Sequence, residues 1–236
     1  MTEITALHFD AGLQKPLRLA VVADLHGGEF DELQKTLESL APHALLCPGD
    51  TLHTATPDDN GIEFLRQASS RFPLFCSIGN HEVKHGTDIR EDIRATGATL
   101  LDDNFTEFMG ITIGGLSTGY KTDLIQSRLK MPPPPNTEAL KGFFEKEGFK
   151  LLLCHHPEYF DTYLKDKPVD LVVSGHAHGG QWRIFGKGIF APGQGFFPKY
   201  TSGLYHGRLL VSRGLSNNTL VPRIFNKRQI VIIELK

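Results

Sequence analysis

LRLAVVADLH, residues 17–26, is an apolar run of strand length that ends in two polar residues, Asp24 and His26. The segment that follows has helical spacing, because its apolar side chains fall on one face of a helix. These side chains are Phe30, Leu33, Leu37 and Leu40. A buried strand followed by an amphipathic helix is the unit from which parallel sheets are built, so this region predicts an α/β fold.

The same alternation continues along the chain, and it is expected to form one domain over residues 1–236. Further strands are predicted over residues 44–47, 74–78, 149–154 and 169–174, and helices around residues 62–68, 89–93 and 137–147. FTEFMGITIGGL, residues 105–116, predicts a hairpin that turns near Met109 and Gly110. The tail is predicted to be rich in strands, over residues 208–212, 219–225 and 229–235.

The composition limits the classes of function. The formal net charge is -2, so no overall basic field attracts nucleic acid, and no stable nucleic-acid partner is expected. The first residues lack the pattern of a secretory signal, and no run approaches the roughly 18 apolar residues of a membrane span. We therefore expect a cytoplasmic protein without a transmembrane segment, and peripheral contact with a membrane remains compatible with the sequence.

Polar residues follow the predicted strands in five places, which read ADLH, PGD, GNHE, CHH and GHAHGG. Loops at the carboxyl ends of parallel strands converge on one crevice, so these side chains are expected to surround a shared centre. Asp24 and His26 are two residues apart in an extended segment and project from the same side, as do His176 and His178. A mixture of carboxylate, amide and imidazole groups is typical of metal ligands.

Two neighbouring cations need a carboxylate able to bridge them, and Asp50, behind the turn at Gly49, is the natural candidate. Divalent ions about 3.5–4 Å apart can hold a hydroxide nucleophile and stabilise an in-line displacement at phosphorus. The mixed ligand set suits manganese and iron as well as zinc. A structural role is the alternative for each motif taken alone, but two imidazoles among three glycines make poor core material.

The chain resembles the calcineurin-like metallophosphoesterases, whose ordered signature is D-x-H, G-D, G-N-H-[DE], H and G-H-x-H. It carries these motifs at residues 24–26, 49–50, 79–82, 155 and 175–178. The runs SGHAHGGQWRIFGKG and SRGLSNN are also similar to the C-terminal region of the bacterial YkuE/YaeI-type subgroup. The resemblance implies a four-layer α/β/β/α sandwich with two mixed central sheets, and two metal ions at the ends of the strands.

The resemblance also implies a role for each residue. Asp24, His26, Asp50 and His178 would bind the first metal, and Asp50, Asn80, His155 and His176 the second, with Asp50 as the bridge. His81 would orient the phosphate and donate a proton to the leaving oxygen, which suits an imidazole because its pKa lies near neutrality. The catalytic residues would then be His81, Asn80 and Asp50. His155 and His156 both follow LLLC, and only the family register selects His155.

The implied reaction is hydrolysis of a phosphodiester or a phosphomonoester, in which a metal-bridging hydroxide attacks phosphorus. The substrate would be a phosphorylated small molecule or a lipid-linked compound. A pyrophosphatase acting on a nucleotide-linked lipid or sugar precursor is an alternative in the same class. A non-catalytic metal-binding scaffold is the alternative from another class, and the complete ligand set together with His81 favours an enzyme.

Several further residues are candidates for the substrate pocket. His53 stands where relatives in the subgroup often have an acidic residue, and many relatives begin with a membrane anchor or export signal that this sequence lacks. His53, His85, His156 and His206 are candidates for the pocket wall, with capping or surface roles as the alternative. Arg183, Arg213 and Arg223 are candidates for a phosphate clamp, because guanidinium offers a bidentate fork, with surface ion pairing as the alternative.

Residues 186–203, GKGIFAPGQGFFPKYTSG, show neither helical nor strand period and predict a long loop. Loops of this length are often functional. The aromatic residues Phe190, Phe196, Phe197 and Tyr200 are expected to form an apolar wall beside the metals that binds the organic part of a substrate, such as a lipid. The alternative is that they pack over a sheet edge.

Overall fold

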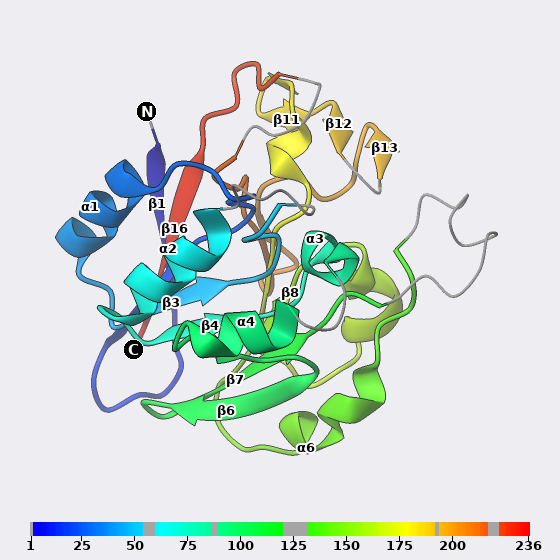
Figure 1. Cartoon of the computed structure of the whole chain (residues 1–236). Coiled ribbons are helices and arrows are strands. Elements are labelled where there is room, and N and C mark those ends of the chain that lie inside the picture. Colours follow the sequence, from blue (N-terminus) through cyan, green and yellow to red (C-terminus); the bar gives the residue numbers. More distant parts are fainter. Residues whose placement is uncertain (1, 54–59, 86–88, 120–131, 192–193, 217–221) are drawn as a thin grey trace.

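The computed structural model describes residues 2–53, 60–85, 89–119, 132–191, 194–216 and 222–236. Two six-stranded sheets lie at its centre, and helices lie on their outer faces (Figure 1). The first half contains β1 (Glu3–Phe9), β2 (Leu17–Val21), α1 (Asp31–Leu40), β3 (Ala44–Cys47), α2 (Asn60–Ser69), β4 (Leu74–Cys76), α3 (Asn80–Lys84), α4 (Ile89–Ala95), β5 (Thr99–Leu100), β6 (Asn104–Phe108) and β7 (Ile111–Leu116).

The second half contains more short elements than the first. They are η1 (Thr137–Leu140), α6 (Lys141–Phe144), β8 (Lys150–Cys154), η2 (Phe160–Leu164), β9 (Leu171–Ser174), η3 (His178–Gly180), β10 (Arg183–Ile184), β11 (Lys187–Gly188), β12 (Phe190–Ala191), β13 (Gly195–Phe196), β14 (Gly203–Tyr205), β15 (Leu209–Val211) and β16 (Gln229–Leu235). β10 pairs with β11 and β12 with β13, so each pair forms a small hairpin outside the two large sheets.

Both large sheets are mixed, as predicted. The first has the strand order β1-β16-β2-β3-β4-β5; β2 to β5 run parallel, and β16 is antiparallel to β2. The second has the order β14-β15-β9-β8-β7-β6, with four parallel strands between two antiparallel edges. The carboxyl ends of β2, β3 and β4 therefore lie along one edge of the first sheet, and those of β8 and β9 along one edge of the second.

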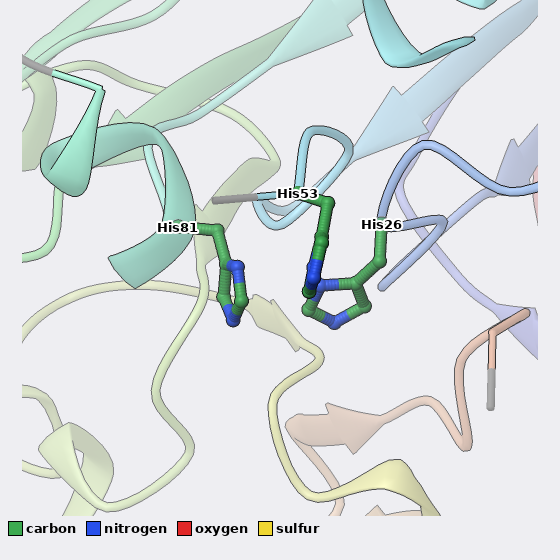
Figure 2. Close-up of side chains that lie close together, drawn as sticks. All are labelled: His26, His53 and His81. Atoms are coloured by element: carbon green, nitrogen blue, oxygen red, sulfur yellow. The ribbon is translucent and has the colours of Figure 1, made fainter. Parts of the chain in front are cut away.

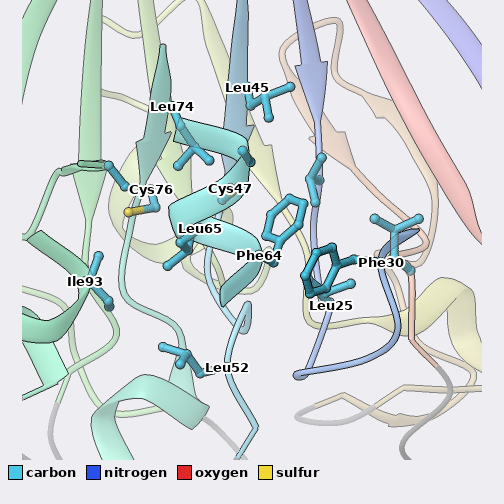
Figure 3. Close-up of a cluster of buried hydrophobic side chains, with 14 of the residues drawn as sticks. Leu25, Phe30, Leu45, Cys47, Leu52, Phe64, Leu65, Leu74, Cys76 and Ile93 are labelled. Carbon is cyan, nitrogen blue, oxygen red and sulfur yellow. The ribbon is translucent and has the colours of Figure 1, made fainter. Parts of the chain in front are cut away.

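The four layers follow from the two-residue period of the strands. In β2, Leu19 and Val21 face the second sheet and pack in the buried cluster between the sheets, whereas Ala20 faces outward. The outward face of the first sheet packs against Phe64 and Leu65 of α2 (Figure 3). The outward face of the second sheet is covered by buried residues of η1, α6 and η2. This arrangement confirms the predicted α/β/β/α sandwich.

The structure corrects three details of the predicted elements. The helix predicted over residues 137–147 ends at Phe144, because the chain must reverse at Gly148, whose φ is 77°, to enter β8. β1 was not predicted, because it is a half-exposed strand without a long apolar run. Of the strand predicted over 219–225, residues 219–221 lie outside the described ranges, and Ile224 forms only an isolated bridge with Trp182.

Two further observations bear on the sequence predictions. Within the described ranges, no helix has the length and apolar character needed to cross a membrane. Residues 186–203 are not structureless, because three short strands, β11, β12 and β13, form within them. The prediction of a continuous loop is wrong there, since two-residue strands are too short to leave a period in the sequence.

Candidate metal centre

Seven polar side chains from both sheets meet at the carboxyl ends of the parallel strands. Asp24 and His26 follow β2, Asp50 follows β3, Asn80 begins α3 after β4, His155 follows β8, and His176 and His178 follow β9. Six of the seven are buried, and Asn80 is half-buried. Because each loop continues a strand of a packed sheet, the positions of these side chains are fixed by the core below them.

Asp50 lies at the centre of this group. Its Oδ2 atom lies 3.1 Å from His155 Nε2, 3.8 Å from His26 Nε2 and 4.0 Å from His81 Nε2. The other carboxylate oxygen, Oδ1, accepts a hydrogen bond of 2.8 Å from the backbone N–H of His81. One oxygen is therefore held by the backbone, while the other faces three imidazoles that come from the loops after β2 and β8 and from α3.

Asp24, His26 and His178 form one buried cluster of possible metal ligands, with donor atoms within 4.8 Å of one another. Asp24 Oδ1 accepts a hydrogen bond of 2.9 Å from the backbone N–H of His176, which connects the loops after β2 and β9. The rings of His26 and His178 stack with centroids 5.1 Å apart. These three residues belong to the ligand set predicted for the first metal.

Asp50, His155 and His176 form a second buried cluster of the same dimensions. His155 Nε2 lies 3.1 Å from His176 Nδ1, while His155 Nδ1 lies 3.1 Å from the carbonyl oxygen of Pro48. The carbonyl holds the imidazole so that Nε2 faces Asp50. Of the two adjacent histidines, His155 lies beside Asp50, whereas His156 lies with Glu158 and His176 in a further group of possible ligands.

The backbone at this centre adopts an unusual conformation. Five of the seven residues have positive φ angles between 45° and 66°, although none of them is glycine; they are Asp24, His26, Asp50, His176 and His178. Left-handed backbone is uncommon for residues with a side chain, and it concentrates at functional sites where the surrounding fold enforces it. The sharp turns aim successive side chains into the centre instead of along the strands.

Glycines bring the backbone close to the two aspartates. A β-carbon on Gly79 would lie 2.3 Å from Asp50 Oδ1, and one on Gly175 would lie 2.8 Å from Asp24 Oδ2. A β-carbon on Gly214, whose φ is 70°, would lie 2.6 Å from the same oxygen of Asp24. Since real β-carbons do not approach so closely, only glycine lets the backbone surround these carboxylates.

Glu82 is a buried carboxylate for which no role was predicted. It accepts hydrogen bonds from the backbone N–H groups of Asp50 at 2.9 Å, Leu52 at 3.0 Å and Gly79 at 2.9 Å. Burial, reinforced by the charge of Asp50, raises the pKa of Glu82 to about 7. The side chain connects the loops after β3 and β4. Its position at the end of the GNHE motif, residues 79–82, is the sequence feature from which a role for Glu82 in the site could have been predicted.

The protonation of the imidazoles suits cation binding. Burial lowers the pKa of His26 to about 2 and holds the pKa values of His176 and His178 below the usual range. Neutral imidazole is the form that binds metal. Burial alone would also lower the pKa of His155, but the adjacent Asp50 carboxylate raises it to about 9. A proton on His155 and a cation would therefore compete for the same negative charge.

Buried donor atoms provide an independent test of whether a metal fits. Asp24 Oδ2, Asn80 Oδ1 and His178 Nδ1 are buried, and among the described residues none of them has a hydrogen-bond partner. An unsatisfied buried polar atom costs about 1–3 kcal/mol, so three at one centre require an explanation. A pair of cations would satisfy them, and the mixture of oxygen and nitrogen donors suits first-row metals. The residues therefore fit the metals that were predicted.

His53 and His81 lie next to His26 at the mouth of the centre. The rings of His53 and His81 stack with centroids 5.0 Å apart, and His26 meets the ring of His81 edge-on at 4.5 Å (Figure 2). The carbonyl oxygen of His53 contacts His85 Nε2. The structure thus places His53, which was a candidate for the pocket wall, beside His81.

The remaining candidate residues fall into different places. His156 is buried against His176, with ring centroids 4.2 Å apart, and His206 stacks on Phe160 outside the centre. Among the arginines, Arg213 pairs with Glu3 at 2.8 Å, and Arg183 donates to the carbonyl oxygen of Gly179 at 2.8 Å. Arg223 donates to the carbonyl oxygens of Ser216 and Arg213, at 2.8 Å and 2.6 Å. The three guanidinium groups therefore bind a carboxylate or backbone carbonyl oxygens of this chain.

The predicted aromatic wall is wrong in its composition. Tyr200 is buried and belongs to the core cluster on the outer face of the second sheet, so it cannot contact a substrate. Phe190 is half-buried and packs against Phe196 at 5.5 Å. Phe196 and Phe197 project into solvent instead of packing over a sheet edge.

A sandwich of two mixed sheets with two clusters of histidine and aspartate at the strand ends is the architecture of a two-metal phosphoesterase. The chain belongs to the calcineurin-like phosphoesterase family, whose model matches residues 17–180. The match includes all seven predicted ligands together with His81, and the predicted family is therefore confirmed.

Individual relatives agree with this assignment. The chain is 29% identical to the uncharacterized metallophosphoesterase YkuE of Bacillus subtilis, over 93% of this chain and 79% of YkuE. It is 28% identical to the phosphodiesterase YaeI of Escherichia coli, over 72% of this chain and 63% of YaeI, so it covers less than two thirds of that relative. The crystal structure of the calcineurin-like phosphoesterase YfkN from Bacillus subtilis shares the fold, with a TM-score of 0.51 at 12% identity, over 84% of this chain and 81% of that structure.

Proposed function

We propose that the chain hydrolyses phosphate esters, with phosphodiesters as its preferred class. The observation that carries this proposal is the surroundings of Asp50, where one carboxylate oxygen faces imidazoles from three separate segments within 4.0 Å. A carboxylate shared between two ligand clusters is what a dinuclear centre requires. The name of the relative YaeI, a phosphodiesterase, supports the choice of diester over monoester.

The ligand sets are assigned by this proposal as follows. Asp24, His26, Asp50 and His178 hold one cation, and Asp50, Asn80, His155 and His176 hold the other. When bound, two such cations supply Lewis acidity toward the phosphoryl oxygens and lower the pKa of water. Glu82 keeps the Asp50 backbone in place through its three hydrogen bonds. The native metals are taken to be manganese, iron or zinc.

His81 is proposed to donate a proton to the leaving oxygen. Its side chain is only partly buried, with 17% of its surface exposed, so a substrate at the mouth of the centre can reach it. Burial lowers the pKa of His81 to about 4, and the Asp50 carboxylate opposes this shift. A phosphate anion against the ring would oppose it further, because a nearby negative charge favours imidazolium.

The test combines the His81→Ala variant with a measurement of metal content. Hydrolysis of a bis-aryl phosphate should fall by a factor on the order of 10²–10⁴, the usual contribution of general acid catalysis, while two metals per chain remain bound. A control is Lys35→Ala, since Lys35 is exposed on α1 and its ion pair is with Glu32. Unchanged hydrolysis in His81→Ala would remove this residue from the mechanism.

A substrate panel separates the remaining alternatives. Bis-aryl phosphate, aryl phosphate and a nucleotide-linked sugar represent diester, monoester and pyrophosphate hydrolysis. Turnover of the first substrate above the other two supports the proposal. Preference for the nucleotide-linked sugar would identify a pyrophosphatase, and metal binding without turnover of any of the three would identify a non-catalytic scaffold.

A further inference from the structure

The charge of the chain is divided unevenly along its length. Between Asp170 and Glu234 the sequence contains no aspartate or glutamate but eight lysines and arginines, although the whole chain has a net charge of -2. The large hydrophobic side chains that are exposed fall in the same region. Apart from Ile4 and Met109, all of those in the described ranges lie between residues 182 and 225. This part of the surface is therefore both basic and apolar.

Three phenylalanines expose nearly their whole surface. The exposed fractions are 101% for Phe185, 87% for Phe225 and 83% for Phe197. All three have positive φ angles, of 49°, 52° and 55°. A bulky residue in left-handed backbone is an outlier, and glycine or asparagine would fit such a turn with less strain. Neither burial nor local backbone preference accounts for phenylalanine at these three turns.

The three residues lie on neighbouring segments. Phe185 is at the turn of the β10–β11 hairpin, and this hairpin shares one shallow groove with Phe197 and another with Phe225. The exposed Trp182 is bridged to Ile224, next to Phe225. Figure 1 shows β11, β12 and β13 together at one end of the molecule. We call Phe185, Phe197 and Phe225 with the basic residues Lys187 and Lys227 the aromatic-basic face.

The aromatic-basic face is connected to the metal centre. Asn226, which follows Phe225, donates hydrogen bonds from its side chain to the carbonyl oxygens of His178 at 2.7 Å and Gln181 at 3.1 Å. Only three residues separate the predicted ligand His178 from Trp182, where the exposed apolar surface begins. A surface that receives the aromatic-basic face would therefore lie close to the phosphoesterase centre.

We propose that the aromatic-basic face docks on the surface of an anionic phospholipid bilayer. Exposed aromatic side chains at turn apices can enter the boundary between headgroups and acyl chains, while lysines and arginines around them are attracted to anionic headgroups. The segment between positions 170 and 234 contributes no acidic residue that would repel such a surface, and Glu3 and Asp161 from other segments are paired with Arg213 and Lys199. Docking in this way would present phosphoesters of the bilayer to the metal centre, but docking itself does not depend on the proposed hydrolysis.

The test is sedimentation of the full chain with vesicles of phosphatidylglycerol and phosphatidylcholine, or of phosphatidylcholine alone. Binding should be stronger to the anionic vesicles and should weaken with salt. The triple variant Phe185→Ser, Phe197→Ser, Phe225→Ser should lose about 1,000-fold or more in vesicle partitioning, since each phenylalanine contributes about tenfold or more. Lys187→Glu with Lys227→Glu should lose about tenfold or more, and chiefly toward anionic vesicles.

Matched controls separate this proposal from the phosphoesterase activity. Ile4→Ser with Met109→Ser removes exposed apolar side chains elsewhere and should leave vesicle binding unchanged. The triple variant should hydrolyse soluble bis-aryl phosphate like the parent protein, whereas Asp50→Asn should abolish hydrolysis and still bind vesicles. Equal vesicle binding by the parent protein and the triple variant would overturn the proposal. The proposal would also be overturned if the parent protein were a dimer that the triple variant converts to a monomer. Tighter binding of the parent protein to a single-stranded oligonucleotide than to vesicles would overturn it as well.

Discussion

Replacing Gly79 by alanine should damage the metal centre without unfolding the protein. A β-carbon at this position would lie 2.3 Å from Asp50 Oδ1 and 2.5 Å from the Asp50 backbone nitrogen. Because real β-carbons essentially never come within 3.0 Å of another heavy atom, Oδ1 would have to move by about 0.7 Å and the nitrogen by about 0.5 Å. The φ of Gly79 is -94°, which alanine adopts readily, so the effect comes from the contact and not from backbone strain.

The size of the effect follows from the position of Asp50 between the two ligand clusters. A displacement of about 1 Å at a reacting centre costs about 10²-fold in rate, and loss of supporting contacts costs metal affinity by about 10–100-fold. We therefore expect kcat on bis-aryl phosphate to fall about 100-fold, with weaker retention of metal during dialysis.

The assay compares Gly79→Ala with Gly142→Ala in steady-state hydrolysis and in metal content. Gly142 lies in α6, where the closest atoms to an added β-carbon are 3.4 Å away, so alanine should be neutral or slightly stabilising there. Parental kcat and metal content in Gly79→Ala would refute the reasoning, because the contact with Asp50 would then be harmless.

Two further predictions concern stability. Glu82→Gln leaves one acceptor oxygen for three N–H donors. Because hydrogen bonds to charged groups contribute about 1.5–3 kcal/mol each, the free energy of unfolding measured in urea should fall by about 2–4 kcal/mol. A decrease below about 1 kcal/mol would show that this carboxylate does not stabilise the two loops. In the metal-free protein, burial lowers the pKa values of five imidazoles, those of His26, His81, His156, His176 and His178. Below about pH 6.5 the unfolded state binds these protons and the folded state does not, so stability should fall with falling pH by about 1.4 kcal/mol per pH unit for each imidazole. Glu82 and Glu158 have the opposite sign and together offset two of them, because burial raises their pKa values to about 7 and favours the protonated folded state. A melting temperature in EDTA that does not decrease between pH 6.5 and pH 5 would exclude this account.

The sequence predicts the parallel part of the fold well because buried strands leave long apolar runs. β2, β3, β8 and β9 are almost entirely buried, and each was found at its place. β1 alternates between exposed and half-buried residues and left no such signal. The predicted cytoplasmic location and the single domain rest on the sequence alone and stay predictions.

The site could be predicted as a set of residues but not as an arrangement. The strand-end motifs named the side chains that meet, because strand direction decides where loops emerge. The left-handed backbone at Asp24 and Asp50, and the hydrogen bonds of Glu82 to the backbone, depend on contacts between loops that are distant in sequence. The exposure of Phe185 and Phe225 was likewise invisible, since their neighbours come from separate segments.

The position of β16 has a consequence for synthesis on the ribosome. β1 pairs with β16 in parallel register, from Glu3 with Gln229 to Phe9 with Leu235, and it lies at the edge of the sheet. The nascent β1 segment therefore has no native partner until residue 229 and those after it have emerged. During that time its backbone donors and acceptors are available to other chains, a known route to aggregation. Slow translation before β16, or truncation of the chain before it, would lengthen the time during which β1 can pair with other chains.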